Sequence, residues 1–115
     1  MIFSTDAFRV RRISDASRII EAFGELDLSS APRLEELLLV LGNPPVTHLE
    51  LDLSGVSLVD AFAMRCILRA SRKLAERGCS LVVCGIRPRV RRVMEIVAFD
   101  REVTLAAPSP LAEPA

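Results

Sequence analysis

The chain has 115 residues and carries 15 basic and 15 acidic side chains, so its formal net charge is zero. Half of its residues are hydrophobic, which is enough for the core of one domain and excludes general disorder. The balanced charge and the lack of Tyr and Trp argue against a general nucleic-acid-binding protein, which needs a basic excess and aromatic rings for base stacking.

The N-terminal part of the chain predicts a β-hairpin and a helix. Residues 8–11 alternate between apolar and basic side chains, which indicates a short strand, and residues 18–23 form a second strand that Gly24 ends. Ser29 or Ser30 is suited to cap the following helix, which has a proline in its first turn. The predicted buried stripe of this helix is Leu34, Leu37, Leu38 and Leu41.

Residues 46–53 predict a strand with two different faces. Its apolar face consists of Leu49, Leu51 and Leu53. Its opposite face consists of His48, Glu50 and Asp52, and we expect that face to be wet or only partly covered. We interpret His48 as a solvated strand residue rather than a functional group.

The second predicted helix runs from a cap at Asp60 to about Arg77. Its predicted inward residues are Met64, Ile67, Leu68, Ser71, Leu74 and Ala75. Cys66 falls on the outer side, flanked by Arg65 and Arg69. Two interpretations of this cysteine stay open: the arginines lower the pKa of a reactive thiol, or the cysteine is a small residue without a role, which we favour.

The last part of the chain completes an α/β pattern. Residues 81–86 are apolar on both faces, as in a central strand, and a third helix begins at Arg87–Pro88, with the stripe Val90, Val93, Met94 and Val97. Residues 102–106 add a short strand. The predicted fold is α/β with a mixed sheet, in the order β-β-α-β-α-β-α-β, antiparallel at its start and parallel after, over residues 1–106. Residues 107–115 hold three prolines and predict a flexible tail.

The sequence predicts a cytoplasmic protein without membrane insertion. The N-terminus lacks the basic start and long apolar run of a signal peptide, and no stretch approaches the roughly 20 apolar residues that span a bilayer. Three cysteines without a disulfide framework favour a reducing compartment.

Little in the sequence predicts catalysis, a metal site or a cofactor. His48 is the single histidine, and the three cysteines lack the paired spacing of zinc ligands. Residues 53–56 contain one glycine and no following lysine, which excludes a P-loop. Since no acid, base and nucleophile come together, we predict that the chain is not an enzyme.

The two signs of charge are separated along the chain. Residues 14–60 contain nine acidic and two basic side chains, whereas residues 61–92 contain nine basic and one acidic side chain. Two interpretations stay open at this point. The opposite charges neutralise each other across solvated faces, or the second and third helices form a basic surface for an acidic protein or phosphate groups.

Phe62 lies at the start of the second predicted helix, opposite the buried stripe and on the side of Arg65 and Arg69. An aromatic ring next to arginine suits the anchor of a protein interface. Alternatively, a side chain in the first turn folds back on the preceding loop and buries itself. Both interpretations stay open.

Residues 24–34, GELDLSSAPRL, and residues 51–60, LDLSGVSLVD, resemble motifs of the STAS domain family. That family includes the bacterial anti-sigma factor antagonists and the cytosolic domains of sulfate transporters. The resemblance runs from about Phe8 to Thr104, and the two motifs stand in the right order. It implies a mixed sheet with helices packed against it, and a domain that performs no catalysis itself.

The resemblance has one departure, at a functional position. In the antagonists, the aspartate equivalent to Asp60 is followed by Ser, then Ser or Thr, then Gly, and an anti-sigma factor that is also a kinase phosphorylates the first serine. This chain has Ala61, Phe62 and Ala63 at those three positions. Ala61 has no hydroxyl, so the resemblance implies an antagonist without the usual switch or a surface turned to another partner. We give little weight to Ser57 as a substitute, because it precedes the helix.

The leading prediction is a bacterial, non-enzymatic regulator of transcription that binds an anti-sigma factor of the histidine-kinase-like type. Its predicted partner-binding residues are Asp27, Ser29, Asp60, Ala61, Phe62, Ala63, Arg65 and Arg69. Two alternatives are a small cytosolic STAS subunit of a membrane lipid-transport complex and a nucleotide-sensing STAS module. The prediction includes no direct nucleic-acid contact and leaves a homodimer open.

Overall fold

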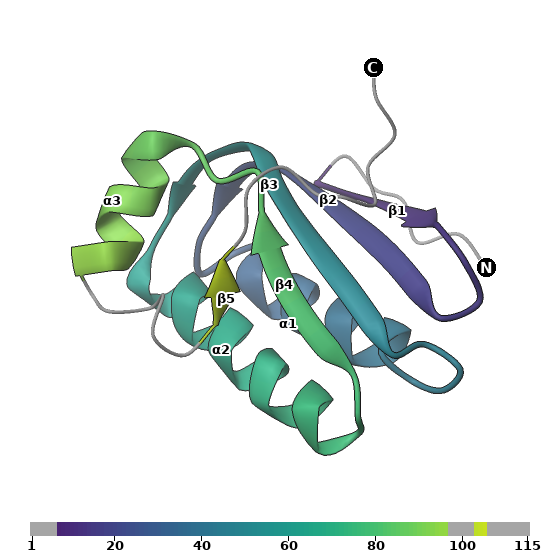
Figure 1. Ribbon diagram of the computed structural model, residues 1–115. Helices are drawn as coiled ribbons and strands as arrows, with labels where there is room; N and C mark the ends of the chain where they lie inside the picture. The colour runs from purple at the N-terminus through teal and green to yellow at the C-terminus, as the bar shows by residue number, and fades with distance from the viewer. Residues whose placement is uncertain (1–6, 97–102, 106–115) are drawn as a thin grey trace.

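The structure is a computed structural model that describes residues 7–96 and 103–105, and its elements follow the predicted order (Figure 1). The strands are β1 Phe8–Arg12, β2 Ser17–Leu26, β3 His48–Val59, β4 Ser80–Cys84 and β5 Thr104–Leu105. The helices are α1 Ala31–Leu41, α2 Ala61–Glu76 and α3 Pro88–Ile96. The predicted tail lies outside the described residues and stays a prediction.

The five strands form one mixed sheet in the order β1-β2-β3-β4-β5. β1 and β2 form the predicted antiparallel hairpin, with Phe8 opposite Ala22, and every later pair is parallel. The prediction of a sheet that is antiparallel at its start and parallel after is therefore confirmed.

Helices α1 and α2 pack side by side against one face of the sheet, and α3 lies near the bend by which β3 leads to α2 (Figure 1). The core fills the space between the sheet and the helices. It includes the predicted leucines of β3 together with Leu34, Leu38, Ile67 and Leu74 from the helices. None of the helices in the described ranges is long and apolar enough to span a membrane.

Two strands are longer than the sequence pattern predicts. Gly24 does not end β2: the strand continues to Leu26, with Gly24 at a φ of 84° beside a register shift. β3 likewise continues to Val59, which pairs with Leu26. Because parallel pairing satisfies the backbone groups of both segments, the two strands extend each other past the point where the side-chain alternation weakens.

The inward face of α2 is also turned from its predicted position. The buried residues of α2 are Ala63, Met64, Cys66, Ile67, Ala70 and Leu74. Leu68 and Ser71 are half-buried and Ala75 is exposed, so the predicted stripe is partly wrong. Because α1 packs beside α2, α2 buries one side toward the sheet and another toward α1, which its own periodicity does not reveal.

Candidate functional site

The ends of β2 and β3 bring together two segments that are distant in the sequence. Leu26 and Val59 pair at the last position of the two strands, and the Asp60 N–H donates to the Leu26 carbonyl at 3.1 Å. The loop 27–30 and the first turn of α2 therefore lie next to each other, at the carboxyl ends of two parallel strands, where open α/β sheets commonly carry binding sites. We call these two segments the tip.

Hydrogen bonds within the loop hold the first half of the tip. The Asp27 carboxylate accepts from the Ser29 N–H at 2.9 Å and from the Ser29 hydroxyl at 2.7 Å. These bonds from Ser29 lower the pKa of Asp27. Ser30 occupies the predicted cap position, but its hydroxyl donates to the Glu25 carbonyl at 2.9 Å and does not cap α1. Leu28, between these anchors, is 69% exposed.

Asp60 holds the second half of the tip and confirms the predicted helix cap. Its carboxylate accepts from the Ala63 N–H at 2.7 Å, and its carbonyl accepts from the Met64 N–H at 3.0 Å. Ala61, the first residue of α2, is exposed. The tip therefore presents a methyl group on the rigid, positively polarised end of a helix.

Phe62 is half-buried and packs against the core. This position is intermediate between the two interpretations of the sequence, an exposed interface anchor and a buried ring. The ring supports the start of α2 rather than standing free as an anchor. Ala63 is fully buried, so its side chain is not accessible to a partner, although it belongs to the predicted set. Exposed apolar surface at this end of the molecule comes instead from Leu28 and Leu58, two residues absent from the predicted set.

The two predicted arginines of α2 differ in their contacts. Arg65 is exposed and makes no ion pair within the described residues. Arg69 donates to both oxygens of Glu35 on α1, from Nε at 2.7 Å and from Nη2 at 2.8 Å. This two-point contact lowers the pKa of Glu35 and raises the pKa of Arg69. Arg69 therefore ties α2 to α1, whereas Arg65 makes no such contact within the described residues.

The outward, reactive interpretation of Cys66 is wrong. Cys66 is buried between α2 and α1, and its pKa is raised by burial and by the Glu35 carboxylate, whose effect exceeds that of Arg69. Burial also raises the pKa of Cys79. Within the described residues, no group of acidic, cysteine or histidine side chains has the geometry of a metal site.

The second face of β3 is more covered than its polar sequence predicts. Glu50 is 1% exposed, whereas His48 and Asp52 are half-buried. The His48 ring lies 2.8 Å from the Ser80 hydroxyl through Nδ1 and 3.5 Å from Glu50 through Nε2. This polar group lies along the strands, away from the tip, and we assign it no role in binding.

A groove that the sequence does not indicate borders the tip on the side of α3. Its lining residues are Ser57, Leu58, Val59, Asp60, Arg89, Val90 and Val93. The predicted stripe of α3 placed Val93 inward, but Val93 is 42% exposed and Val97 lies outside the described residues. Val90 and Met94 are the buried residues of α3.

Comparison with known proteins places these features in a family. The sequence pattern of the STAS domain matches residues 7–110. An anti-sigma-B factor antagonist of Listeria monocytogenes is 33% identical over 77 residues, which cover 67% of this chain and 68% of the relative.

The fold of this chain resembles those of two solved structures. The unphosphorylated anti-sigma factor antagonist SpoIIAA has a TM-score of 0.76 at 18% identity and covers 90% of both chains. An anti-sigma factor antagonist from Mycobacterium paratuberculosis has the same TM-score at 22% identity, and covers 90% of this chain and 86% of its own. At these identities the two structures support the fold alone.

Proposed function

The chain belongs to the STAS domain family, and from this premise we propose that it is a non-enzymatic binding protein of the anti-sigma factor antagonist type. The tip would bind an anti-sigma factor of the histidine-kinase-like type in the bacterial cytoplasm. The family match and the antagonist relatives support the general role. The exposed Ala61 on a capped helix, beside a hydrogen-bonded loop, carries the more specific proposal.

The composition of the tip suits a protein partner. Leu28 offers apolar surface, while Asp27 and Ser29 offer polar atoms that the loop already holds in place. Arg65, one turn into α2, adds a charge that has no ion-pair partner within the described residues. A pre-ordered surface of this kind loses little conformational entropy on binding. The half-buried Phe62 supports that order from below.

Ala61 sets the mode of regulation that we propose. A phosphate on a serine at this position would add a charge of about −1.5 to −2 in the middle of the docking surface. Alanine has no hydroxyl to accept it, so the chain would bind its partner whether or not that partner is an active kinase. We therefore propose a constitutive antagonist.

Isothermal titration calorimetry with kinase-like anti-sigma factors from the same genome tests the binding role. We expect one of them to form a stoichiometric complex with the full chain. Ala61→Glu should abolish that complex, because it places a negative charge at the tip without removing the cap. Ala75→Glu is the matched control, since Ala75 is exposed near the other end of α2, and it should bind normally. A failure of all such factors to bind would refute the proposed function.

Phosphorylation tests the missing switch separately. With the kinase-like partner and ATP, the unchanged chain should gain no phosphate, whereas Ala61→Ser should gain one and lose binding. Fragmentation mass spectrometry of the tryptic peptide that spans residues 34–65 distinguishes a phosphate at position 61 of the Ala61→Ser variant from a phosphate on the natural Ser57 in the same peptide. Phosphate on Ser57 of the unchanged chain would contradict constitutive binding and leave the binding role intact.

A further inference from the structure

The groove between β3 and α3 has a volume of about 290 Å³ and combines a buried floor with exposed apolar sides. Val59 and Val90 are buried, whereas Leu58 from β3 is 43% exposed and Val93 from α3 is 42% exposed. Two apolar side chains thus stay partly exposed on opposite sides of one groove, where an apolar anchor of a partner would find contact on both sides.

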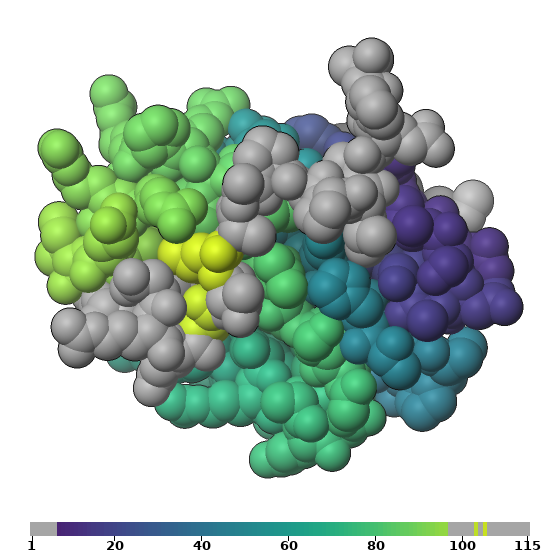
Figure 2. Space-filling view, viewed as in Figure 1, coloured from purple at the N-terminus to yellow at the C-terminus, as the bar shows by residue number. Residues whose placement is uncertain are grey.

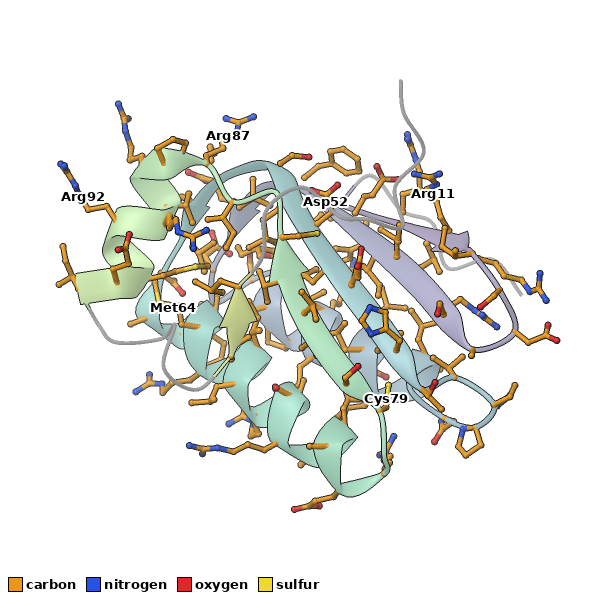
Figure 3. All side chains as sticks on the ribbon, viewed as in Figure 1. Arg11, Asp52, Met64, Cys79, Arg87 and Arg92 are labelled. Carbon is orange, nitrogen blue, oxygen red and sulfur yellow. The ribbon has the colours of Figure 1, made fainter. Side chains whose placement is uncertain are left out.

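The helix that forms one side of this groove is strongly basic. α3 has three exposed arginines, Arg89, Arg91 and Arg92, and Arg87, which directly precedes it, is also exposed. Glu95 is the one acidic residue of α3. Figure 2 shows the side chains of α3 projecting from the left of the molecule, and Figure 3 shows Arg92 pointing away from its body.

Most of this positive charge is uncompensated within the described residues. Arg87 donates from Nε to the Ser54 carbonyl at 2.9 Å, whereas Arg89, Arg91 and Arg92 have no ion pair there. Arg69 on α2, in contrast, is paired with Glu35. Within the described residues, no carboxylate therefore compensates the charge of Arg89, Arg91 and Arg92.

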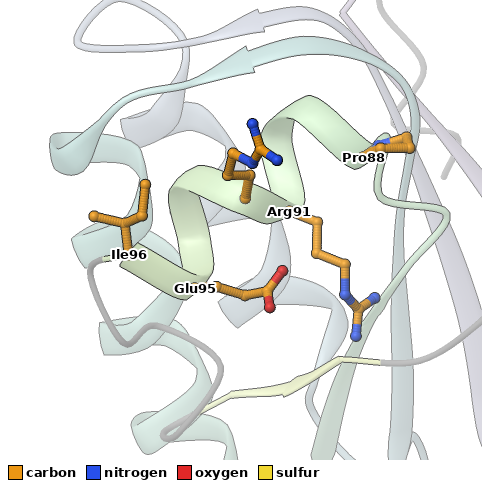
Figure 4. Close-up of a pocket in the computed structure, with 5 residues that line it drawn as sticks. Pro88, Arg91, Glu95 and Ile96 are labelled. Atoms are coloured by element: carbon orange, nitrogen blue, oxygen red, sulfur yellow. The ribbon is translucent and has the colours of Figure 1, made fainter.

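A second hollow on α3, outside the groove, is also lined by arginines. A shallow hollow of about 580 Å³ on this helix is lined by Pro88, Arg91, Arg92, Glu95 and Ile96 (Figure 4). Ile96 is largely exposed. Both hollows thus place an apolar side chain beside arginine, the combination that suits an acidic segment with apolar anchors.

We propose that the groove between β3 and α3 binds an acidic amphipathic segment of a partner protein. One or two apolar side chains of that segment would lie against Leu58 and Val93, and its carboxylates would face Arg89 and Arg92. Asp60 also lines the groove and would repel carboxylates, so the acidic side of the segment would lie toward α3.

The apolar sides favour a peptide segment over a phosphate ligand. Phosphate groups would pair with the arginines but leave Leu58 and Val93 uncovered, and the volume is at the lower limit of small-molecule pockets, which is about 300 Å³. An amphipathic helix laid in a groove covers both kinds of surface at once. The proposal does not require that the partner be an anti-sigma factor.

Fluorescence anisotropy with two labelled synthetic helical peptides tests the proposal on the full chain. One peptide has leucines at i and i+4 flanked by glutamates, and its matched counterpart has lysines in place of the glutamates. At low ionic strength the acidic peptide should bind and the basic peptide should not. The double variant Arg89→Glu, Arg92→Glu and the variant Val93→Asp should each weaken binding about tenfold or more.

Two control variants carry the same changes elsewhere. Lys73→Glu reverses a charge on the exposed side of α2, and Val40→Asp changes an exposed valine of α1; both should leave peptide binding unchanged. Circular dichroism melting curves should show that all variants are folded.

The proposal would be overturned by no binding of the acidic peptide, by equal binding of both peptides, or by normal binding of the acidic peptide to Val93→Asp. Displacement of the peptide by inorganic phosphate without dependence on Val93 would assign the arginines to a phosphate ligand and would also overturn it. The anti-sigma factor titration uses a different probe and a different variant, Ala61→Glu. Either proposal can therefore fail alone.

Discussion

Helices α2 and α3 both follow a parallel strand and both carry arginines, but the fold holds them differently. α2 has 16 residues, buries six of them and begins with the Asp60 cap. α3 has nine residues and buries two, Val90 and Met94. Arg69 of α2 is paired with Glu35 of α1, whereas three arginines of α3 have no ion pair within the described residues.

The difference shows that α2 serves mainly the packing of the fold, whereas α3 lies mainly at the surface. The middle of α2 uses its apolar side for the core, and one of its arginines, Arg69, for a contact with α1. The first turn of α2 exposes Ala61, and α3 exposes Val93, Ile96 and its arginines, side chains that contribute little to the core. The two proposed binding surfaces therefore lie where the fold has left side chains unused.

The largest expected effect comes from truncating a buried residue of α2. Ile67→Ala should lower the free energy of unfolding by about 2–5 kcal/mol, because it removes apolar contacts and leaves a cavity. Val93→Ala on α3 should change it by no more than about 0.5 kcal/mol, since Val93 is partly in water. Urea unfolding followed by circular dichroism measures both.

Met94→Ala sharpens the same comparison within α3. Met94 is the neighbour of Val93 but is fully buried, so its truncation should cost about 2–5 kcal/mol. If Val93→Ala proved as costly as Met94→Ala, Val93 would belong to the core and the proposed groove would lose one side.

A smaller, pH-dependent effect should distinguish the arginines of the two helices. Arg69→Ala should lower stability slightly at neutral pH, well below the effect of Ile67→Ala, because Arg69 is more than half exposed. The folded-state pKa of Glu35 lies below its ordinary value of 4.5, so the contribution of the pair is present above that pH. It should disappear as the pH falls below 4.5 and through the lower folded-state pKa.

Arg92→Ala is the control for this measurement. Arg92 has no ion pair within the described residues, so its removal should leave stability unchanged at every pH. A difference between the unchanged chain and Arg69→Ala that persisted at low pH would contradict an ionic origin.

The last comparison concerns the rate at which thiols on the two helices react, and we expect no change in stability there. Cys66, Cys79 and Cys84 are buried, and burial raises the pKa of the first two, so the native protein should react slowly with a disulfide reagent at pH 8. Val93→Cys should add one rapidly reacting thiol on α3. Fast reaction of the unchanged native chain would show that the core around these cysteines opens more readily than its packing indicates.

Much of the fold could be predicted from local sequence patterns. The apolar face of β3 and the cap at Asp60 each depend on a few neighbouring residues, and both are confirmed. The predicted stripe of α1 is confirmed in part, because Leu34 and Leu38 are buried whereas Leu37 and Leu41 are half-buried. Strand ends were less predictable, because Gly24 and Val59 owe their place to pairing between β2 and β3.

The tip could be predicted in part. Sequence motifs brought out Asp27, Asp60 and Ala61, but they did not show that Ala63 is buried, that Phe62 is half-buried or that Leu58 borders a groove. These properties depend on which residues cover α2 from neighbouring elements.

The sequence by itself determined the order of the elements, the capped start of α2 and the presence of an alanine, which has no hydroxyl, at position 61. Tertiary structure alone decided that Glu50 and Cys66 are buried, that Arg69 is paired and that α3 leaves its arginines exposed. The physical reason is range: periodicity and capping act between near neighbours, whereas burial and ion pairing depend on side chains brought together from distant parts of the chain.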